Sequence, residues 1–393
     1  MNPSGGATHR LAVDQEYLVR TCQALVRINS VNPILIPGAP GEGAIADYVA
    51  SELSRLGLRV ERHEPEPGRV SVVGYRPGTG GGRSLMLNAH IDTVGVEGMD
   101  EPFSGEVREG RIYGRGAYDM KGSLACCLGA AKAIQDAGAT LRGDLIVAAV
   151  ADEEYGSLGT TDLLQHTRPD GAIVTEPTAL AVCLAHKGYL WIEVRTEGRA
   201  AHGSRFQEGI DANMRMGRFL SRLEGLERDL RARPPHPLVG PPSLHAAVLG
   251  GGSGLSTYAA ECRLQIERRT VPGETESAVM EEIRAILDDL REEDPGYAGS
   301  ARTFFVREPF EVSQNAAVVR AVAASVRAVI DEEPRFVGDT PWMDSALLTA
   351  AGVETVVFGP AGTGAHAREE WVDIASMVRC AEVLARSAVE YCA

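Results

Sequence analysis

Four short apolar runs, each leading to ionisable residues, constrain the fold of this chain more than any other feature. The runs occupy residues 85–87, 145–150, 172–174 and 355–358. The ionisable residues that follow them are His90, Asp92, Asp152, Glu153, Glu154, Glu176 and, after a glycine-rich turn, His366. Continuous apolar runs of this length are typical of strands buried on both faces, with helices between them. We therefore predict an α/β fold with a mostly parallel sheet flanked by helices.

The carboxyl ends of these strands are the expected place for a binding site. Ligands of such sheets gather beyond the carboxyl ends of the strands, so the ionisable residues are expected to share one crevice. Asp119 joins this set because a helical period follows it directly, at Met120, Leu124, Leu128, Ala131 and Ile134. We expect a helix that begins directly after Asp119 and packs on the sheet.

The pattern changes from about residue 184 to residue 297. Leu190, Ile192 and Val194 alternate with polar or larger residues, and residues 261–267 alternate in the same way, as in half-exposed antiparallel strands. Two helices are expected among them, over residues 210–230 and 275–291. We predict a catalytic domain over 1–183 and 299–393, interrupted by an α+β dimerisation or lid domain over 184–298.

Composition excludes several classes of protein. The 39 Lys and Arg residues against 54 Asp and Glu give a net charge of −15, and no basic run forms a nucleic-acid surface. No apolar stretch is long enough for a membrane span, and residues 1–13 lack a secretion signal, so a cytoplasmic protein is expected. The seven cysteines include no C-x-x-C pair and are expected to be small core residues.

The strand-end set needs a positive partner, because unpaired acids and imidazoles in one crevice repel one another and lose their hydration. Two His and three carboxylates suit two divalent ions such as Zn²⁺. Asp119 is placed to bridge the two ions. One further acid must stay off the metals to move a proton. Glu153 and Glu154 could divide these roles, and the spacing alone does not say which is the ligand.

Seven short stretches occur in a characteristic order along the chain. They are 88-NAHIDTV-94, 114-GRGAYDMKG-122, 151-ADEEYGSLGT-160, 174-VTEPT-178, 200-AAHGS-204, 267-ERRTVPGET-275 and 363-TGAHAREEWV-372. Together they resemble the M20 family of di-zinc metallopeptidases and deacylases, which includes acetylornithine deacetylase, succinyl-diaminopimelate desuccinylase and carboxypeptidase G2. The resemblance spans almost the whole chain.

This resemblance implies a role for each metal ligand. It implies that His90 and Glu176 bind the first metal, and that Glu154 and His366 bind the second. Asp119 would bridge both. Zn²⁺ is the expected ion, with Co²⁺ or Mn²⁺ as alternatives.

The resemblance also implies roles around the metals. Glu153 would be the general base, and Asp92 would orient His90. His202 resembles the histidine that family members supply across a dimer to stabilise the oxyanion; a surface His is the alternative. Arg269 resembles the arginine that receives the substrate carboxylate, although a surface ion pair with Glu267 would also explain it.

The remaining expectations concern the substrate. Gly362, Thr363 and Gly364 form a loop whose backbone could approach the substrate, or whose glycines could simply permit a turn. The implied activity is hydrolysis of the amide bond of an N-acyl amino acid by a metal-bridging water, in a homodimer. A carboxypeptidase or dipeptidase is the alternative within the class, and a non-catalytic metal-binding protein is the alternative outside it.

Overall fold

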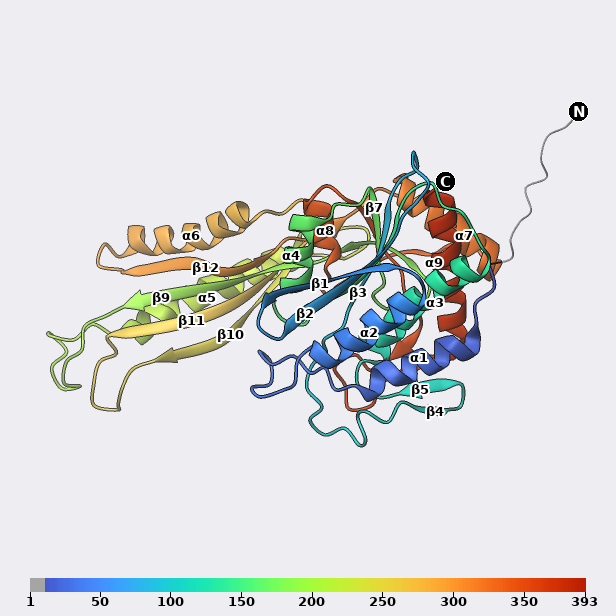
Figure 1. Cartoon of the computed structure of the whole chain (residues 1–393). Helices are drawn as coiled ribbons and strands as arrows, with labels where there is room; N and C mark the ends of the chain where they lie inside the picture. Colours follow the sequence, from blue (N-terminus) through green and yellow to red (C-terminus); the bar gives the residue numbers. More distant parts are fainter. Residues whose placement is uncertain (1–10) are drawn as a thin grey trace, which may run out of the picture. The chain divides into compact units, whose positions relative to one another are not determined.

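The computed structural model describes residues 11–393 and divides into two compact units (Figure 1). The first unit comprises the chain up to Leu184, Val312–Val337 and Met343–Ala393, and the second comprises Ala185–Glu311 and Gly338–Trp342. The chain was expected to return to the catalytic domain at residue 299, but in this division it returns to the first unit at Val312. The reason is that residues 299–307 form a strand of the second unit's sheet.

Residues 1–10, on which the expected absence of a secretion signal mostly rests, lie outside the described residues. Between residues 11 and 393, no helix has the length and apolar character needed to cross a membrane. All seven cysteines are buried and free, as expected for small core residues.

The largest sheet contains the four predicted strands side by side. Its order is β1-β2-β6-β3-β7-β15-β8-β13, and β14 also pairs with β8. The strands are β1 (Arg59–Glu66), β2 (Arg69–Arg76), β3 (Leu85–His90), β6 (Leu145–Val150), β7 (Gly171–Val174), β8 (Val182–His186), β13 (Phe310–Glu311), β14 (Phe336–Asp339) and β15 (Glu354–Val357). The pairs β6–β3, β3–β7 and β7–β15 are parallel, which confirms the mostly parallel sheet.

Helices cover this sheet because its central strands are buried along their whole length. The helices of the first unit are α1 (Gln15–Arg27), α2 (Gly43–Arg55), α3 (Gly122–Asp136), α4 (Leu158–His166), α7 (Ala317–Ile330), α8 (Ser345–Ala350) and α9 (Ile374–Tyr391). Helices α1, α3, α7 and α9 form a contiguous group, and α4 contacts α8. Helices α2 and α4 both pack on β1 and β2, from opposite sides in Figure 1.

A small second sheet of the first unit brings two distant segments together. Its order is β16-β17-β5-β4, made of β4 (Glu106–Arg108), β5 (Arg111–Tyr113), β16 (Gly362–Thr363) and β17 (Trp371–Asp373). All three pairings are antiparallel. The turn between β16 and β17 contains His366. His366 is therefore positioned by this hairpin and does not lie at the end of β15.

The second unit is an antiparallel sheet with two helices, as the period-two pattern predicts. The sheet order is β10-β11-β9-β12, from β9 (Gly188–Glu197), β10 (Ser243–Gly251), β11 (Glu261–Thr270) and β12 (Gly299–Arg307). Helices α5 (Ala212–Ala232) and α6 (Glu276–Glu293) lie within a few residues of their predicted positions. Leu190, Ile192 and Val194 belong to the core that these helices share with the sheet.

Candidate metal centre

The first unit brings the predicted metal ligands together. His90 is the last residue of β3, Glu154 lies in the turn after β6, and Glu176 follows β7. Asp119 lies in a short π-helical turn, η1 (Ala117–Lys121), and the regular helix α3 begins only at Gly122. The helix therefore begins three residues after Asp119, because Asp119 and Met120 have non-helical backbone angles.

His90, Asp119 and Glu176 form the first group of ligand atoms. His90 Nε2 lies 3.1 Å from Asp119 Oδ1 and 3.6 Å from Glu176 Oε1. On the other side of the ring, His90 Nδ1 lies 3.0 Å from the backbone carbonyl oxygen of Asp92, to which it can donate. That hydrogen bond fixes the proton on Nδ1 and leaves the Nε2 lone pair facing the two carboxylates, as a metal ligand requires.

Asp119, Glu154 and His366 form the second group. His366 Nε2 lies 2.9 Å from Glu154 Oε2 and 3.4 Å from Asp119 Oδ2. Asp119 thus directs one oxygen to each histidine. Within the described residues, the buried Glu154 Oε1 has no hydrogen-bond partner. A buried oxygen without a partner is costly, and a cation beside it would remove that cost.

The pKa values of these side chains also favour bound cations. Burial raises the pKa of Glu176 well above its usual value, and burial together with Asp119 raises the pKa of Glu154 to about 6. Burial alone would lower the pKa of His90, but Glu176 and Asp119 hold it well above its usual value. Hydrogen bonds with Asp119 and Glu154 raise the pKa of His366 to about 10. These shifts follow from the crowding of carboxylates and imidazoles in one buried place, and two divalent ions there would balance the negative charge.

Asp92 holds the turn that carries Glu153 and Glu154. Its fully buried carboxylate accepts hydrogen bonds from the backbone N–H groups of Glu153 at 3.1 Å and Glu154 at 3.2 Å. The two residues lie in a turn and not in an extended strand. The Glu153 carboxylate forms no hydrogen bond with any residue between 11 and 393, whereas the Glu154 carboxylate faces His366.

A buried polar network that the sequence did not predict lies behind Asp92. Asn32 donates to Asp92 Oδ2 at 2.8 Å and to Asp152 Oδ1 at 2.9 Å. Arg69 donates to Asp152 at 2.7 Å and makes two hydrogen bonds with Glu42. Asp152 follows one of the four apolar runs, next to Glu153. Asn32, Glu42 and Arg69 come from segments without a distinctive sequence pattern. The network fixes both sides of the turn that carries Glu153.

Glu370 is a further residue that the sequence did not single out. Its buried carboxylate accepts hydrogen bonds from three backbone N–H groups, those of Gly116, Tyr118 and Asp119, at 3.1, 2.9 and 3.0 Å. It also pairs with the buried Arg115 at 2.6 Å. The Glu-Glu pair in the last matching stretch was the available signal, but the sequence does not say which glutamate is buried.

The predicted substrate loop is constrained by packing. At Gly362, a Cβ atom would clash with the Trp371 carbonyl oxygen. Gly364 has a φ of +92°, and a Cβ atom there would clash with the Glu369 carbonyl oxygen. Both glycines are therefore required by the hairpin itself. Thr363 is exposed between them.

Arg269 and His202 lie in the second unit. Arg269 Nε donates to Glu267 Oε1 at 2.7 Å, and its guanidinium lies 4.8 Å from the centre of the Tyr189 ring. The surface ion pair with Glu267 that was the alternative for Arg269 is therefore present. His202 is exposed, and its Nδ1 accepts a hydrogen bond from the backbone N–H of Ser204 at 3.2 Å. The substrate and oxyanion roles of these residues stay predictions.

Comparison with known proteins identifies the class. The sequence pattern of Peptidase family M20/M25/M40 matches residues 86–390. The chain belongs to this family of hydrolases. An acetylornithine deacetylase of Myxococcus xanthus is 33% identical over 365 residues, with 88% of this chain and 92% of the relative covered. An N-formyl-4-amino-5-aminomethyl-2-methylpyrimidine deformylase of Bacillus subtilis (strain 168) is 30% identical, with 96% and 95% covered.

A solved structure agrees on the fold. A dinuclear metal-binding peptidase of family M20 from Bacillus subtilis superimposes with a TM-score of 0.74. The match covers 95% of this chain and 97% of that one at 15% sequence identity. At this identity the likeness establishes the arrangement of the elements, and substrate preference does not follow from it.

The Glu370 contacts generate a prediction about metal affinity. Replacing Glu370 with Gln removes the negative charge that organises three N–H groups around Asp119. Residues that orient metal ligands typically contribute about 10–100-fold to metal affinity. We expect Glu370→Gln to weaken zinc binding by about that factor, measured by competition with a chromophoric chelator.

Glu369→Gln is the matched control, because Glu369 is the exposed neighbour of Glu370. It should bind zinc as the unmodified protein does. Equal zinc affinity in the two variants would show that the Glu370 contacts do not support the metal ligands.

Proposed function

We propose that this chain is a di-metal hydrolase that cleaves the amide bond of an N-acyl amino acid, as a deacetylase or desuccinylase does. The observation that carries the proposal is the pair of ligand groups that share Asp119. The first metal would be held by His90, Asp119 and Glu176, and the second by Asp119, Glu154 and His366. Nitrogen and oxygen donors in each group suit Zn²⁺, with Co²⁺ and Mn²⁺ as alternatives.

The fit of the metals rests on the donor set and on the partnerless Glu154 Oε1. Two cations bound there would supply Lewis acidity toward a substrate carbonyl and make a water molecule more acidic. Asp92 would keep His90 in the tautomer whose Nε2 is free.

Glu153 is our proposed general base. Its carboxylate forms no hydrogen bond with the described residues, and burial raises its pKa well above the usual value. A carboxylate with raised proton affinity takes a proton from water more readily near neutral pH. Asp92 holds the Glu153 backbone, which limits the directions that the side chain can take. Glu153 would then give the proton to the leaving amine.

His202 is our proposed donor to the oxyanion that forms on the acyl carbon. A backbone N–H can only donate, so the contact with Ser204 makes His202 Nδ1 an acceptor. The neutral ring then carries its proton on Nε2, which can donate to a developing negative charge. We propose that His202 acts on the site of a second copy of the chain.

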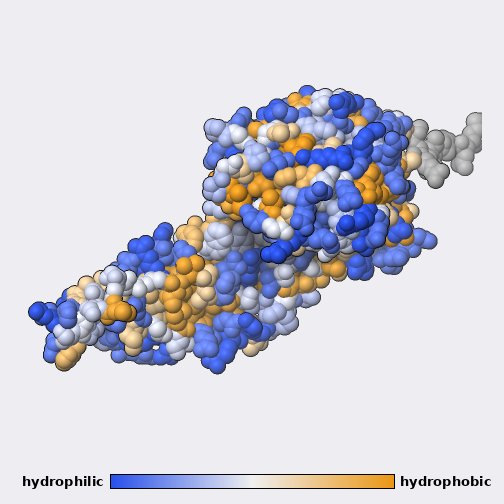
Figure 2. Space-filling view, turned by 90° about the horizontal axis from the view of Figure 1, so that it is seen from below, coloured by the Kyte–Doolittle hydropathy of each residue, from blue (hydrophilic) through white to orange (hydrophobic). Residues whose placement is uncertain are grey.

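A homodimer through the second unit is supported by its surface. Strand β10 is an edge strand, and Val248 and Leu249 on it are 58% and 56% exposed. Figure 2 shows a band of hydrophobic side chains on the elongated part of the surface that the second unit forms. An edge strand with exposed apolar side chains favours pairing with another chain.

Arg269 is our proposed receiver of the substrate carboxylate, and the backbone of residues 362–364 is the proposed contact with the acyl group. A guanidinium can bind a carboxylate through two parallel hydrogen bonds. Binding would require Arg269 to exchange its ion pair with Glu267 for the substrate. That exchange is cheap, because about a third of the Arg269 side chain is exposed and the pair is partly hydrated.

The substrate class rests on the relatives. The name of the 33% identical relative specifies deacetylation of acetylornithine, which favours N-acyl amino acids. The name of the 30% identical relative favours removal of a formyl group from an aminopyrimidine as a second candidate. A carboxypeptidase or dipeptidase would use the same metal centre. A non-catalytic metal-binding protein would have no need of the uncommitted Glu153 carboxylate.

A substrate panel tests the proposal. The protein is assayed with Zn²⁺, Co²⁺ or Mn²⁺ added. We expect kcat/KM for N-acetyl or N-succinyl amino acids to exceed that for dipeptides and for the N-formylaminopyrimidine by at least about tenfold. The reason is that contacts with the leaving group discriminate among these substrates. A preference for dipeptides would establish the peptidase alternative. No hydrolysis of any compound by the metal-loaded protein would establish the non-catalytic one.

Glu153 can be separated from the metal ligands by matched glutamine variants. We expect Glu153→Gln to lower kcat about 10²–10⁴-fold while the metal content stays unchanged, because only proton transfer is lost. Glu154→Gln should instead lower the metal content. Metal analysis and turnover are measured on the same samples. Near-normal turnover in Glu153→Gln would rule out its role as base.

Mixed dimers test the role of His202. His202→Ala and Glu153→Gln should each be nearly inactive alone. If His202 serves the partner's site, one site of each mixed dimer keeps both residues. Random mixing of equal amounts should then restore roughly one quarter of the normal activity, since half of the dimers are mixed. No recovery in dimers shown by mass spectrometry to be mixed would place His202 in its own chain's site, or outside catalysis.

A further inference from the structure

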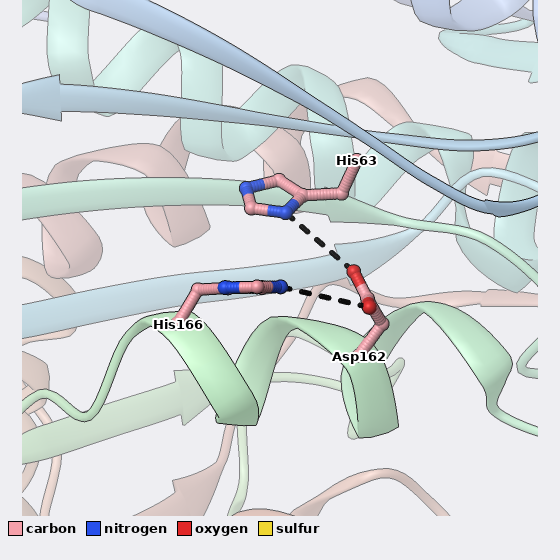
Figure 3. A group of neighbouring side chains, drawn as sticks. All are labelled: His63, Asp162 and His166. Carbon is pink, nitrogen blue, oxygen red and sulfur yellow. Dashed lines mark ion pairs between the residues drawn. The ribbon is translucent and has the colours of Figure 1, made fainter.

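A further cluster of potential metal ligands lies in the first unit, apart from the two ligand groups that share Asp119. It consists of His63 on β1 and of Asp162 and His166 on α4 (Figure 3). His63 Nδ1 lies 3.5 Å from Asp162 Oδ2, and His166 Nε2 lies 3.7 Å from Asp162 Oδ1. None of the three belongs to a stretch that carries the proposed hydrolysis.

The secondary structure places these three side chains next to one another. Asp162 and His166 are four residues apart, so they lie on the same face of α4. Strand β1 packs against α4, and His63 points from the strand toward that face, as Figure 3 shows. The two imidazole rings are 5.0 Å apart between centroids and tilted by 36°, so they converge without stacking flat.

The spacing of the donor atoms fits one small cation. One donor atom from each residue can be chosen so that all three lie within 4.8 Å of one another. Ligands bound to tetrahedral Zn²⁺ at about 2.0–2.2 Å are separated by about 3.3–3.6 Å. The 3.5 and 3.7 Å distances join the two histidines to different oxygens of Asp162, so the three side chains must move toward one another from within the 4.8 Å limit to reach that range.

The far side of the His63 ring supports the same assignment. His63 Nε2 is buried and has no hydrogen-bond partner among the described residues. The nearest carboxylate is that of Glu61, whose Oε2 lies 3.9 Å away. Metal binding at Nδ1 would fix the proton on Nε2, and the N–H would face Glu61. Metal-bound imidazoles usually have such a carboxylate partner.

We propose that His63, Asp162 and His166 form a separate binding site for a divalent transition metal, with Zn²⁺ as the best-fitting ion. Two imidazole nitrogens and one carboxylate favour Zn²⁺ over Mg²⁺ and Ca²⁺, which prefer oxygen ligands. The His166 side chain is 52% exposed, so the ion can enter from solvent and water can complete its coordination.

The metal would join an edge strand to a helix. Strand β1 is at the end of the sheet order, and within residues 11–393 it pairs only with β2. Helix α4 follows the turn that carries Glu153 and Glu154. An ion that binds the folded chain and not the unfolded one stabilises the folded state, so this site is a structural clamp between β1 and α4.

Zinc counting tests the proposal on the full-length protein. The unmodified protein, His166→Gln and Asp162→Asn are dialysed against the same buffered free Zn²⁺ and analysed by inductively coupled plasma mass spectrometry. We expect each variant to hold one zinc fewer per chain than the unmodified protein. His245→Gln, which removes an exposed histidine of the second unit, is the control for adventitious zinc and should show no loss.

Hydrolytic activity shows which site lost the ion. His166→Gln should keep kcat/KM within about twofold, since this cluster shares no residue with the two ligand groups around Asp119. Equal zinc content in the unmodified protein and both variants, with folding verified by circular dichroism, would overturn the proposal. Loss of zinc together with loss of activity would also overturn it, because the missing ion would then be catalytic. The zinc count does not depend on which substrate the enzyme hydrolyses.

Discussion

The Asp119 carboxylate lies between two histidines, and the arrangement of the candidate metal centre depends on that placement. One oxygen faces His90 and the other faces His366, residues 276 positions apart in the chain (366 − 90). Burial alone would raise the pKa of Asp119, but the hydrogen bonds with the two histidines hold it below its usual value. A carboxylate that stays ionised while buried is suited to bridge two cations, because it brings negative charge to both at once.

Other buried polar groups hold this carboxylate and its neighbours in place. Glu370 fixes the backbone on one side of Asp119, while Asp92 and Asn32 fix the turn after β6. Glu370 and Asp92 accept hydrogen bonds from backbone N–H groups, and Asn32 donates to the Asp92 carboxylate, so their positions are set by the fold itself. The proposed metal ligands are therefore held in position by the folded chain, which would limit the reorganisation that ion binding requires.

Sequence patterns predicted the parts of the fold that depend on local periodicity. The four apolar runs are adjacent strands, and both helices of the second unit lie within a few residues of their expected positions. The structure differs from these predictions where contacts between segments distant in the sequence determine the local structure. Helix α3 begins after a π-helical turn, His366 is positioned by a hairpin, and β12 pairs with β9, so the chain leaves the second unit later than residue 299.

The sequence by itself determined the class of protein and the residues that could bind metal, because short motifs in a fixed order specify both. It could not separate Glu153 from Glu154 by spacing, and it did not reveal Glu370 or the cluster of His63, Asp162 and His166. Those features arise where segments from different elements come into contact, and local sequence patterns do not predict such contacts. Tertiary structure decided them, because the burial of a carboxylate and the distance between two donor atoms exist only in the folded chain.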